Sequence, residues 1–296
     1  MSVFLCSVLP PLGLYTLISR YLLKNPHYLH RKKKTAFYCT QISHRGGSGE
    51  KIENTMEAFT NALEKGSQML EMDCHLTKDG HVVVSHDENL KRQTGVDKDI
   101  SSLNLEDLPL YKEKLEVVFN AGHGTDRKIA LLEDVFRTFP NIPVSIEIKE
   151  DNPQLMRENG SMPYSFSKQR GILLLLLYYT GLLPFVPVGE SVLQFYLPRL
   201  INRSVCRACL PCKRLKRNLA STALRSRTTM RKNLFKHLAD RGIQVHLFVC
   251  NKNEDIKAAF DLGATGVMTD YPTLLSTYVK THMGHIKIVK PTATFP

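Results

Sequence analysis

The chain contains 296 residues, of which 43% are hydrophobic and 23% are charged. These proportions are typical of a folded protein and exclude an intrinsically disordered chain, and the length is sufficient for one large α/β domain. The formal net charge of +12 is unusually high. It favours an anionic partner, either nucleic acid or a membrane surface with anionic substrates.

The positive charge is concentrated in two parts of the chain. Residues 1–49 contain no Asp or Glu, and neither do residues 191–239, which carry twelve Lys or Arg. Both parts adjoin apolar runs and no nucleic-acid-binding motif is present, so we expect a membrane partner and no nucleic-acid partner. A basic face that is merely solvated is the alternative that these observations leave open.

The first apolar run is Val3–Leu23, which is close to the roughly 20 residues that cross a bilayer. Basic residues follow it at Arg31–Lys34, whereas a secretory signal carries its charge before the apolar run. We therefore expect residues 1–24 to be a transmembrane anchor. Arg20 and the Pro10-Pro11 pair favour the alternative, a shallow anchor in the membrane interface.

Strand-like and helix-like patterns alternate after this run. Strands are predicted over Phe37–His44, Met69–Thr77, Val82–His86 and Pro143–Lys149, and helices over Thr55–Lys65 and Ile129–Phe139. Strands separated by helices are typical of parallel βαβ units.

A second apolar run, Gly171–Val188, lies deep in the chain. It is a candidate for a membrane hairpin, a second span or a buried helix. The block Leu173–Leu177 followed by two tyrosines favours the membrane interface. We expect residues 171–239 to form an insertion that is first apolar and then basic.

The pattern resumes near the C-terminus. Further strands are predicted over Tyr164–Ser167, Gln244–Cys250 and Gly266–Thr269, with a helix over Glu254–Leu262. Together the strands predict an α/β fold, a TIM (β/α)8-type barrel spanning residues 39–280, followed by a tail over residues 281–296.

Polar side chains lie at or near the carboxyl ends of four predicted strands, where a (β/α) barrel carries its active site. They are His44, Arg45, Glu71, Asp73, His86, Glu147 and Lys149. The alternation of a strand places Glu71 and Asp73 on one side. Each residue alone is often structural, but four consecutive strands that all end in complementary groups indicate a site.

The residue types indicate a reaction. Inward carboxylates need a counter-ion, and three of them suit a hard divalent metal ion such as Mg²⁺ or Ca²⁺. Histidines can serve as general base and general acid near neutral pH. Arg45 and Lys149 supply positive charge for an anionic group, and arginine suits phosphate. The implied chemistry is metal-assisted hydrolysis of a phosphoester.

Six motifs carry a family resemblance. They are His44-Arg45-Gly46, Glu53-Asn54-Thr55, Glu71-Met72-Asp73, Val84-Ser85-His86-Asp87, Ile146-Glu147-Ile148-Lys149 and Gly266-Val267-Met268-Thr269-Asp270-Tyr271-Pro272. In order and spacing they resemble the glycerophosphodiester phosphodiesterase family over roughly residues 39–150 and 240–280. The apolar N-terminus, Gly181–Phe185 and Leu105–Leu115 are similar to its small mammalian membrane branch, which acts as a lysophospholipase D.

The resemblance implies a TIM barrel that hydrolyses lysophospholipids or glycerophosphodiesters. The products would be lysophosphatidic acid or glycerol phosphate plus the head-group alcohol, such as choline or an N-acylethanolamine. The substrate's own glycerol hydroxyl could attack phosphorus, which would remove the need for a protein nucleophile. The implied roles are an acid/base pair for His44 and His86, phosphate binding for Arg45, charge stabilisation for Lys149, and metal ligation for Glu71, Asp73 and Glu147, with His86 as a further candidate ligand.

One departure from the family concerns the barrel wall. Family members carry another helix and strand after Lys149, but only Glu150–Met162 remain before the next predicted strand, and a βαβ unit takes about 30 residues or more. We therefore expect a barrel one strand short. The alternative function is a catalytically inert membrane protein. For an active enzyme we expect an internal membrane, endoplasmic reticulum or perinuclear, with the catalytic domain on the cytoplasmic side, and the sequence leaves the oligomeric state open.

Overall fold

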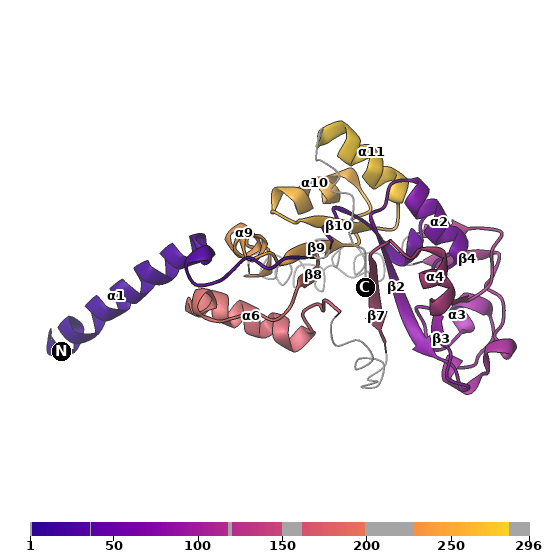
Figure 1. Ribbon diagram of the computed structural model, residues 1–296, viewed down its shortest axis with the longest axis horizontal. Coiled ribbons are helices and arrows are strands. Elements are labelled where there is room, and N and C mark those ends of the chain that lie inside the picture. Colours follow the sequence, from indigo (N-terminus) through magenta and orange to yellow (C-terminus); the bar gives the residue numbers. More distant parts are fainter. Residues whose placement is uncertain (1, 36, 118–119, 150–161, 199–227, 284–296) are drawn as a thin grey trace, which may run out of the picture. The chain divides into compact units, whose positions relative to one another are not determined.

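The computed structural model describes residues 2–35, 37–117, 120–149, 162–198 and 228–283 (Figure 1). The chain forms two compact units. The first unit comprises Met1–Thr35, Pro163–His246 and Phe260–Thr265, and the second comprises Ala36–Met162, Leu247–Ala259 and Gly266–Pro296. The predicted skipped segment within Glu150–Met162 lies almost wholly outside the described residues, as does the predicted tail 281–296 beyond residue 283.

The second unit is built on a mainly parallel sheet. Its strands are β1 (Gln41–Ser43), β2 (Met69–Leu76), β3 (Val82–Val84), β6 (Ala130–Leu131), β7 (Val144–Ile148) and β10 (Gly266–Thr269). The order is β6-β3-β2-β1-β10, with β7 also paired to β2. β10, β1, β2 and β7 run parallel to one another, as expected for the predicted βαβ units.

β3 differs from the prediction of a parallel barrel strand over Val82–His86, because it pairs antiparallel with β2. The turn Lys78-Asp79-Gly80 is tight: the Thr77 amide donates to the His81 carbonyl at 2.9 Å, and Gly80 has a φ of +85°. Two neighbouring strands joined by so short a turn can only be antiparallel, since a parallel connection needs a dozen or more residues. A second hairpin, β4 (Lys114–Val117) with β5 (Asn120–His123), was not predicted.

Helices flank these strands. They are α2 (Met56–Glu64), α3 (Lys91–Thr94), α4 (Leu132–Thr138), α10 (Asn253–Asp261, whose last two residues belong to the first unit) and α11 (Pro272–His282), with short 3₁₀ turns η2 (His44–Gly46), η3 (Ile100–Ser102) and η4 (Leu105–Asp107). The predictions of helices at α2, α4 and α10 are confirmed to within a few residues.

The core of the second unit fixes which way β2 faces. Leu70, Met72 and Cys74 alternate along β2 and are buried against α2, where Phe59 and Ala62 are also buried. Successive side chains of a strand point to opposite faces. The residues between them, the two carboxylates of the Glu-x-Asp motif, therefore point away from this cluster.

The first unit contains both apolar runs. Its elements are α1 (Ser2–Lys24), η1 (Pro26–Tyr28), α6 (Lys168–Thr180), η5 (Leu183–Phe185), β8 (Val192–Tyr196), α9 (Lys232–Asp240) and most of β9 (Gln244–Phe248). β8 pairs with β9 and was not predicted, because it lies in the segment that we expected to be an insertion. The predicted strand Tyr164–Ser167 is only an isolated bridge from Ser165 to Val192.

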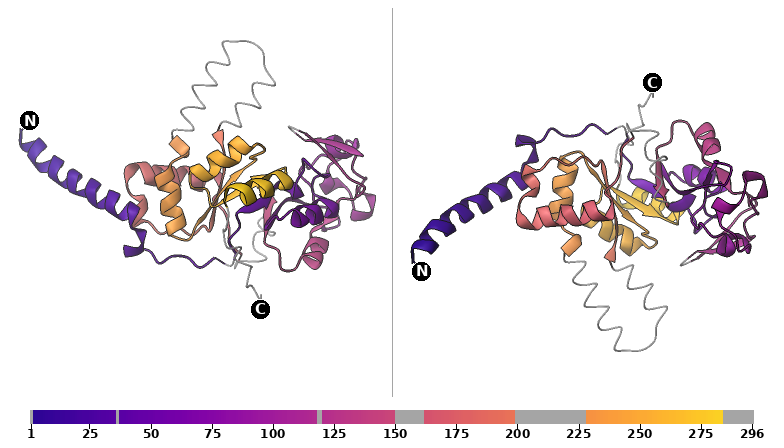
Figure 2. Two further views of the ribbon diagram at one scale, coloured as in Figure 1. Left: turned by 90° about the horizontal axis from the view of Figure 1, so that it is seen from above. Right: turned by 90° about the horizontal axis from the view of Figure 1, so that it is seen from below.

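The C-terminal half of α1 packs within this unit, while its N-terminal half extends away from the other helices (Figures 1 and 2). Tyr15 donates from its hydroxyl to the Thr180 carbonyl at 2.6 Å, and Ser19 donates to the Gly181 carbonyl at 2.6 Å. Both carbonyls lie at the end of α6, so hydrogen bonds link the two apolar helices.

Among the helices of the described residues, none is long and apolar enough to cross a membrane. The expected transmembrane anchor over residues 1–24 is therefore not supported. α1 has sufficient length, but it contains two prolines and Arg20, and its packing places hydroxyl groups against α6. α6 is 13 residues long, and Leu174 is buried while Leu173 and Leu176 are exposed.

Glu57 lies in the first turn of α2. Its carboxyl group makes the free energy of unfolding depend on pH in the acid range. Its carboxylate accepts hydrogen bonds from the amides of Thr125 and Asp126 at 2.8 and 2.9 Å and pairs with Lys51 at 2.6 Å. The Lys51 hydrogen bond and these amides lower the pKa of Glu57 to about 2. We expect wild type to be more stable than Glu57→Gln near neutral pH, by less than about 1 kcal/mol because solvent screens the group.

A depressed carboxyl pKa contributes stability above the unfolded pKa of about 4.3 and loses it as the pH falls. The stability difference should therefore shrink between about pH 4.5 and 2. Denaturant unfolding of both proteins across this range checks the expectation, and a difference that stays constant with pH would contradict it.

Candidate active site

Three carboxylates meet at the sheet of the second unit. Glu71 and Asp73 lie two residues apart on β2, and the register of β2 with β7 places Glu147 directly opposite Asp73. One carboxylate oxygen from each of the three lies within 4.8 Å of the others. Glu71 and Asp73 are buried, whereas the Glu147 side chain is 61% exposed. An all-carboxylate cluster open on one side has the donor chemistry for a hard divalent ion.

The electrostatics of this cluster favour a cation. Burial raises the pKa of Glu71 to about 7, and the neighbouring charge of Asp73 adds to the increase, although His44 and Arg45 oppose it. Burial disfavours the charged form of a carboxyl group, and a nearby positive charge favours it. A bound cation would supply that charge, so the residues fit a metal ion.

The loop after β1 turns sharply beside the cluster. Arg45 has a φ of +52°, and Gly46 and Gly47 have φ values of +76° and +92°. A Cβ on Gly47 would lie 2.6 Å from a ring carbon of Pro272, so only glycine fits there. This left-handed turn aims the Arg45 amide at Glu71, to which it donates at 2.8 Å. A non-glycine residue in this conformation costs about 1–3 kcal/mol, which the carboxylate contact helps to offset.

The Arg45 guanidinium lies beside the same carboxylates. Its Nη1 donates to Glu53 at 3.1 Å, and its Nε lies 3.5 Å from Asp73. Lys149 approaches from β7, with its Nζ 2.9 Å from Asp73 and 2.8 Å from Glu147. Burial lowers the pKa of Lys149, but the two carboxylates outweigh burial and raise it, so this lysine stays charged beside the cluster.

His44 is held by the carboxylate of Asp270, a residue of the last motif for which the sequence predicts no role. Its Nδ1 lies 2.6 Å from Asp270, which follows β10 and also accepts hydrogen bonds from Ser48 at 2.7 Å and Asn251 at 2.5 Å. Burial lowers the pKa of His44, but the charges of Asp270 and Glu71 raise it overall. The carboxylate therefore both orients the ring and favours its protonated form.

Changing Asp270 to Asn tests this positioning. We expect kcat to fall about 10- to 100-fold, as is typical when the hydrogen-bond partner of a functional histidine is lost, with little change in KM. The pH–rate profile should shift to lower pH, because the neutral amide no longer supports the imidazolium. Steady-state kinetics across pH measures both effects, and a fall in kcat without any shift of the profile would indicate a purely structural role.

His86 has a similar arrangement in the loop that follows β3. Its Nδ1 lies 2.5 Å from Asp87, and the other oxygen of Asp87 accepts from Arg92 Nε at 2.5 Å. Burial raises the pKa of Asp87, but hydrogen bonds from His86 and Arg92 lower it overall. Arg92 also reaches Glu53, with Nη2 to Oε1 at 2.6 Å.

Glu53 connects the two halves of the site. It is fully buried, and one oxygen accepts from Arg92 while the other accepts from Arg45. The chain of contacts therefore runs from His86 through Asp87, Arg92 and Glu53 to Arg45. This network was not predicted from the sequence, although Glu53 belongs to one of the six motifs and Asp87 directly follows His86.

Arg45 and Lys149 thus contact the carboxylate cluster, and His44 interacts with the charge of Glu71. The Glu53 network links His86 to Arg45. His86 is not one of the three residues whose ligand atoms converge, so its role as a metal ligand stays a prediction. Thr55 caps α2 by accepting from the Ala58 amide at 3.2 Å. Asn54 instead adopts a φ of +58° and lies 3.4 Å from Asp73 through Nδ2.

Several known proteins are similar to this chain. The profile of the glycerophosphoryl diester phosphodiesterase family matches residues 44–171. Lysophospholipase D GDPD3 of Homo sapiens is 44% identical over 315 aligned positions, which cover 95% of this chain and 98% of that protein. Lysophospholipase D GDPD1 of Homo sapiens is 44% identical, covering 92% and 96%. The 315-position alignment is longer than the chain, so it includes positions for which this chain has no residue.

Solved structures match the fold. A glycerophosphodiester phosphodiesterase from Thermotoga maritima has a TM-score of 0.52 at 20% identity, covering 81% of this chain and 98% of its own. An Oleispira antarctica phosphodiesterase in complex with the product sn-glycerol-3-phosphate has a TM-score of 0.50 at 16% identity, covering 83% and 98%. At these identities the similarity shows the fold alone, which is α/β and TIM-barrel-like.

Proposed function

The chain belongs to the glycerophosphoryl diester phosphodiesterase family, and from this premise we propose that it is a lysophospholipase D. It would cleave the head-group side of the phosphodiester in lysophospholipids and release lysophosphatidic acid with an alcohol such as choline or an N-acylethanolamine. The observation that carries the proposal is the convergence of Glu71, Asp73 and Glu147 beside two cationic side chains. The names of relatives with 44% identity over most of the chain support the substrate class.

The three carboxylates would hold a divalent cation, Mg²⁺ or Ca²⁺, because hard ions prefer oxygen ligands. When bound, such an ion polarises phosphoryl oxygens and stabilises the charge that develops on them. Arg45 supplies a planar guanidinium that suits a phosphate. Lys149 adds a second positive charge next to Asp73 and Glu147.

The two histidines form the proposed acid/base pair. In each ring Nδ1 is bound by an aspartate, and no hydrogen-bond partner of Nε2 is present among the described residues. Nε2 is therefore the atom that exchanges a proton with the substrate. One histidine takes the proton of the attacking hydroxyl, either water or the glycerol hydroxyl of the substrate, and the other protonates the departing alcohol. Attack by water gives lysophosphatidic acid directly. Attack by the glycerol hydroxyl gives a cyclic phosphodiester, and a water then opens this ring to give lysophosphatidic acid.

A second candidate function is hydrolysis of water-soluble glycerophosphodiesters by the same site. Comparing lysophosphatidylcholine with glycerophosphocholine at equal concentrations, and identifying the products, tests the choice. We expect choline and lysophosphatidic acid from the first substrate with the higher kcat/KM. Release of phosphocholine would contradict cleavage on the head-group side, and a preference for glycerophosphocholine would favour the second candidate.

We also propose that the first unit attaches to a membrane interface. Large apolar side chains are exposed along α1, α6 and η5, namely Val8, Leu9, Leu12, Leu14, Leu17, Ile18, Tyr21, Ile172, Leu173, Leu176, Tyr179, Leu182 and Phe185. Apolar helix faces flanked by basic residues are typical of interfacial attachment. The expected location is the cytoplasmic side of the endoplasmic reticulum or perinuclear membrane, and imaging the full chain against an organelle marker tests it.

A further inference from the structure

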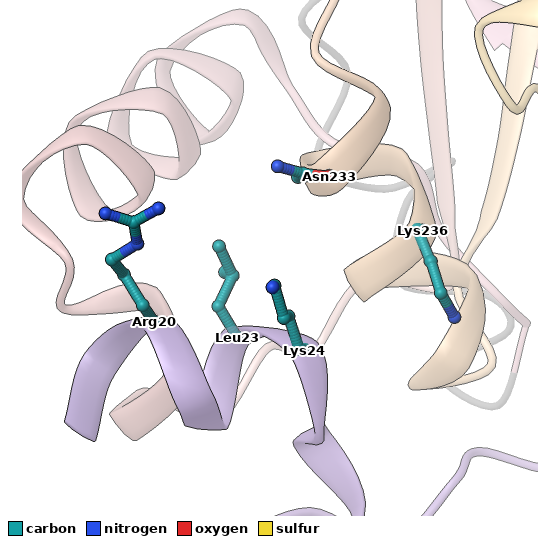
Figure 3. A pocket seen from close by; sticks show the side chains of 5 residues that line it. All are labelled: Arg20, Leu23, Lys24, Asn233 and Lys236. Atoms are coloured by element: carbon teal, nitrogen blue, oxygen red, sulfur yellow. The ribbon is translucent and has the colours of Figure 1, made fainter. Parts of the chain in front are cut away.

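We infer that the first unit carries a binding site for the phosphate head group of an anionic membrane lipid, at a small cavity between α1 and α9. The cavity has a volume of about 70 Å³ and is lined by Arg20, Leu23, Lys24, Asn233 and Lys236 (Figure 3). One ordered water needs about 10–15 Å³ on the same measure, so the space has room for a small group. The inference rests on the proposed membrane attachment. It adds the class of lipid that would strengthen the binding of the first unit to the membrane.

The walls of the cavity are held together by a buried hydrogen bond. His237 of α9 is fully buried and donates from Nδ1 to the Leu23 carbonyl of α1 at 2.8 Å. Figure 3 shows Leu23 and Lys24 reaching from α1 toward Asn233 of α9. The cavity is therefore a defined gap between two fixed helices. Most of its surface is apolar, and Figure 3 shows the amine of Lys236 turned away from Lys24.

The charges at the cavity are largely uncompensated. Lys236 pairs with Asp240 at 2.7 Å, but no carboxylate partner of Arg20 or Lys24 is found among the described residues. In the described part of the first unit, twelve Lys or Arg stand against three Asp or Glu, of which Glu190 already pairs with Arg170. An arginine, a lysine and an amide around one gap supply the donors that a phosphodiester accepts.

The surroundings of the cavity favour a membrane lipid over a soluble phosphate. Leu17 and Tyr21 lie within one turn of Arg20 on α1 and are 69% and 55% exposed. A lipid can place its head group at the cations while its acyl chains contact such apolar side chains, whereas a free phosphate gains nothing from them. Negatively charged lipids also attract basic residues close to the surface by about 1 kcal/mol each.

The test measures binding of the full chain to vesicles of neutral phosphatidylcholine and to vesicles that also contain phosphatidylserine. Arg20→Gln/Lys24→Gln should lose about 30-fold in affinity for the anionic vesicles, which corresponds to about 2 kcal/mol. The matched control is Arg31→Gln/Lys34→Gln, which removes the same charge from exposed residues of the same unit outside the cavity. Arg20→Lys/Lys24→Arg should bind as wild type, and this variant separates charge loss from misfolding.

If the two double-Gln variants lose equal affinity for the anionic vesicles, the cavity is not a specific site and a diffuse basic surface explains the binding. Release of the bound chain by millimolar inorganic phosphate would overturn the lipid assignment. Wild-type binding to neutral and anionic vesicles alike would overturn the head-group site while leaving membrane attachment intact, whereas no binding to either would also contradict attachment. Hydrolysis of glycerophosphocholine in solution, measured in parallel, reports the catalytic proposal independently of all these outcomes.

Discussion

Replacing His44 with alanine is expected to lower kcat for lysophosphatidylcholine hydrolysis by about 10²- to 10⁴-fold, which is the usual contribution of one general acid or base. KM should change little, because the phosphate contacts are assigned to Arg45 and Lys149. The imidazole is held by Asp270 at 2.6 Å and lies in the field of Glu71. Its loss removes proton transfer and leaves the carboxylate cluster in place. Steady-state kinetics on purified protein measures the effect.

The control is His81→Ala. His81 lies on the turn between β2 and β3, its side chain is 50% exposed, and its only described ion pair is with Asp79. That variant should retain wild-type activity. If both alanine variants keep full activity, His44 is not part of the reaction. If the wild type itself has no activity, the catalytically inert alternative is favoured. The next measurement would then be the activity of a relative that has residues at the positions where this chain has none.

Replacing Glu71 with glutamine, or removing divalent metal with a chelator, is expected to lower hydrolysis by at least about 10³-fold, since metal stabilisation of a phosphoryl transition state supplies several kcal/mol. The glutamine side chain is nearly isosteric with glutamate, but it removes one of the two buried negative charges that attract the ion. It also weakens the acceptor for the Arg45 amide, which lies 2.8 Å away. Calorimetric titration with Mg²⁺ and Ca²⁺, together with activity, separates weaker metal binding from a distorted loop.

Glu106→Gln provides the matched control, because Glu106 is exposed on η4 and lies outside the carboxylate cluster. It should bind metal and turn over as wild type does. Activity that survives exhaustive chelation, or a Glu71→Gln variant with unchanged metal affinity, would contradict a metal site at the three carboxylates. Restoration of wild-type activity by Mg²⁺ but not by Ca²⁺, or the reverse, identifies the working ion.

The carboxylate cluster could be anticipated because it depends on local geometry. Two residues spaced by one on a strand share a face whatever the rest of the chain does, so Glu71-x-Asp73 predicted a common side before any packing was known. Glu147 followed from the expectation that parallel strands end at one edge of a sheet. The register of β2 with β7 places it opposite Asp73.

The partner of His44 could not be anticipated, because it depends on long-range packing. Asp270 lies 226 residues from His44 in the chain, and no local pattern links them. Glu53 lies 39 residues before Arg92 and joins it to Arg45 through both of its oxygens. Pairings of this kind are set by the tertiary fold, and Arg92 lies outside all six motifs.

The elements that differed from prediction also depend on pairing and packing, which the local sequence pattern does not determine. β3 reads as a buried strand in either orientation, and only the short turn before it determines that it runs antiparallel to β2. β8 lies after a long apolar run whose composition suggested an insertion. The span expected over α1 is not supported among the described residues, and Tyr15 and Ser19 hydrogen-bond to the end of α6.

The central claim is that three carboxylates and two aspartate-bound histidines hydrolyse the head-group ester of a lysophospholipid. The most direct measurement is the release of choline and lysophosphatidic acid from lysophosphatidylcholine by the purified full chain, with chelator and then with added Mg²⁺ or Ca²⁺. We predict that the two products appear in equal amounts, only when a divalent ion is present, and that Glu71→Gln abolishes both. Metal-independent release, or release of phosphocholine instead of choline, would contradict the claim.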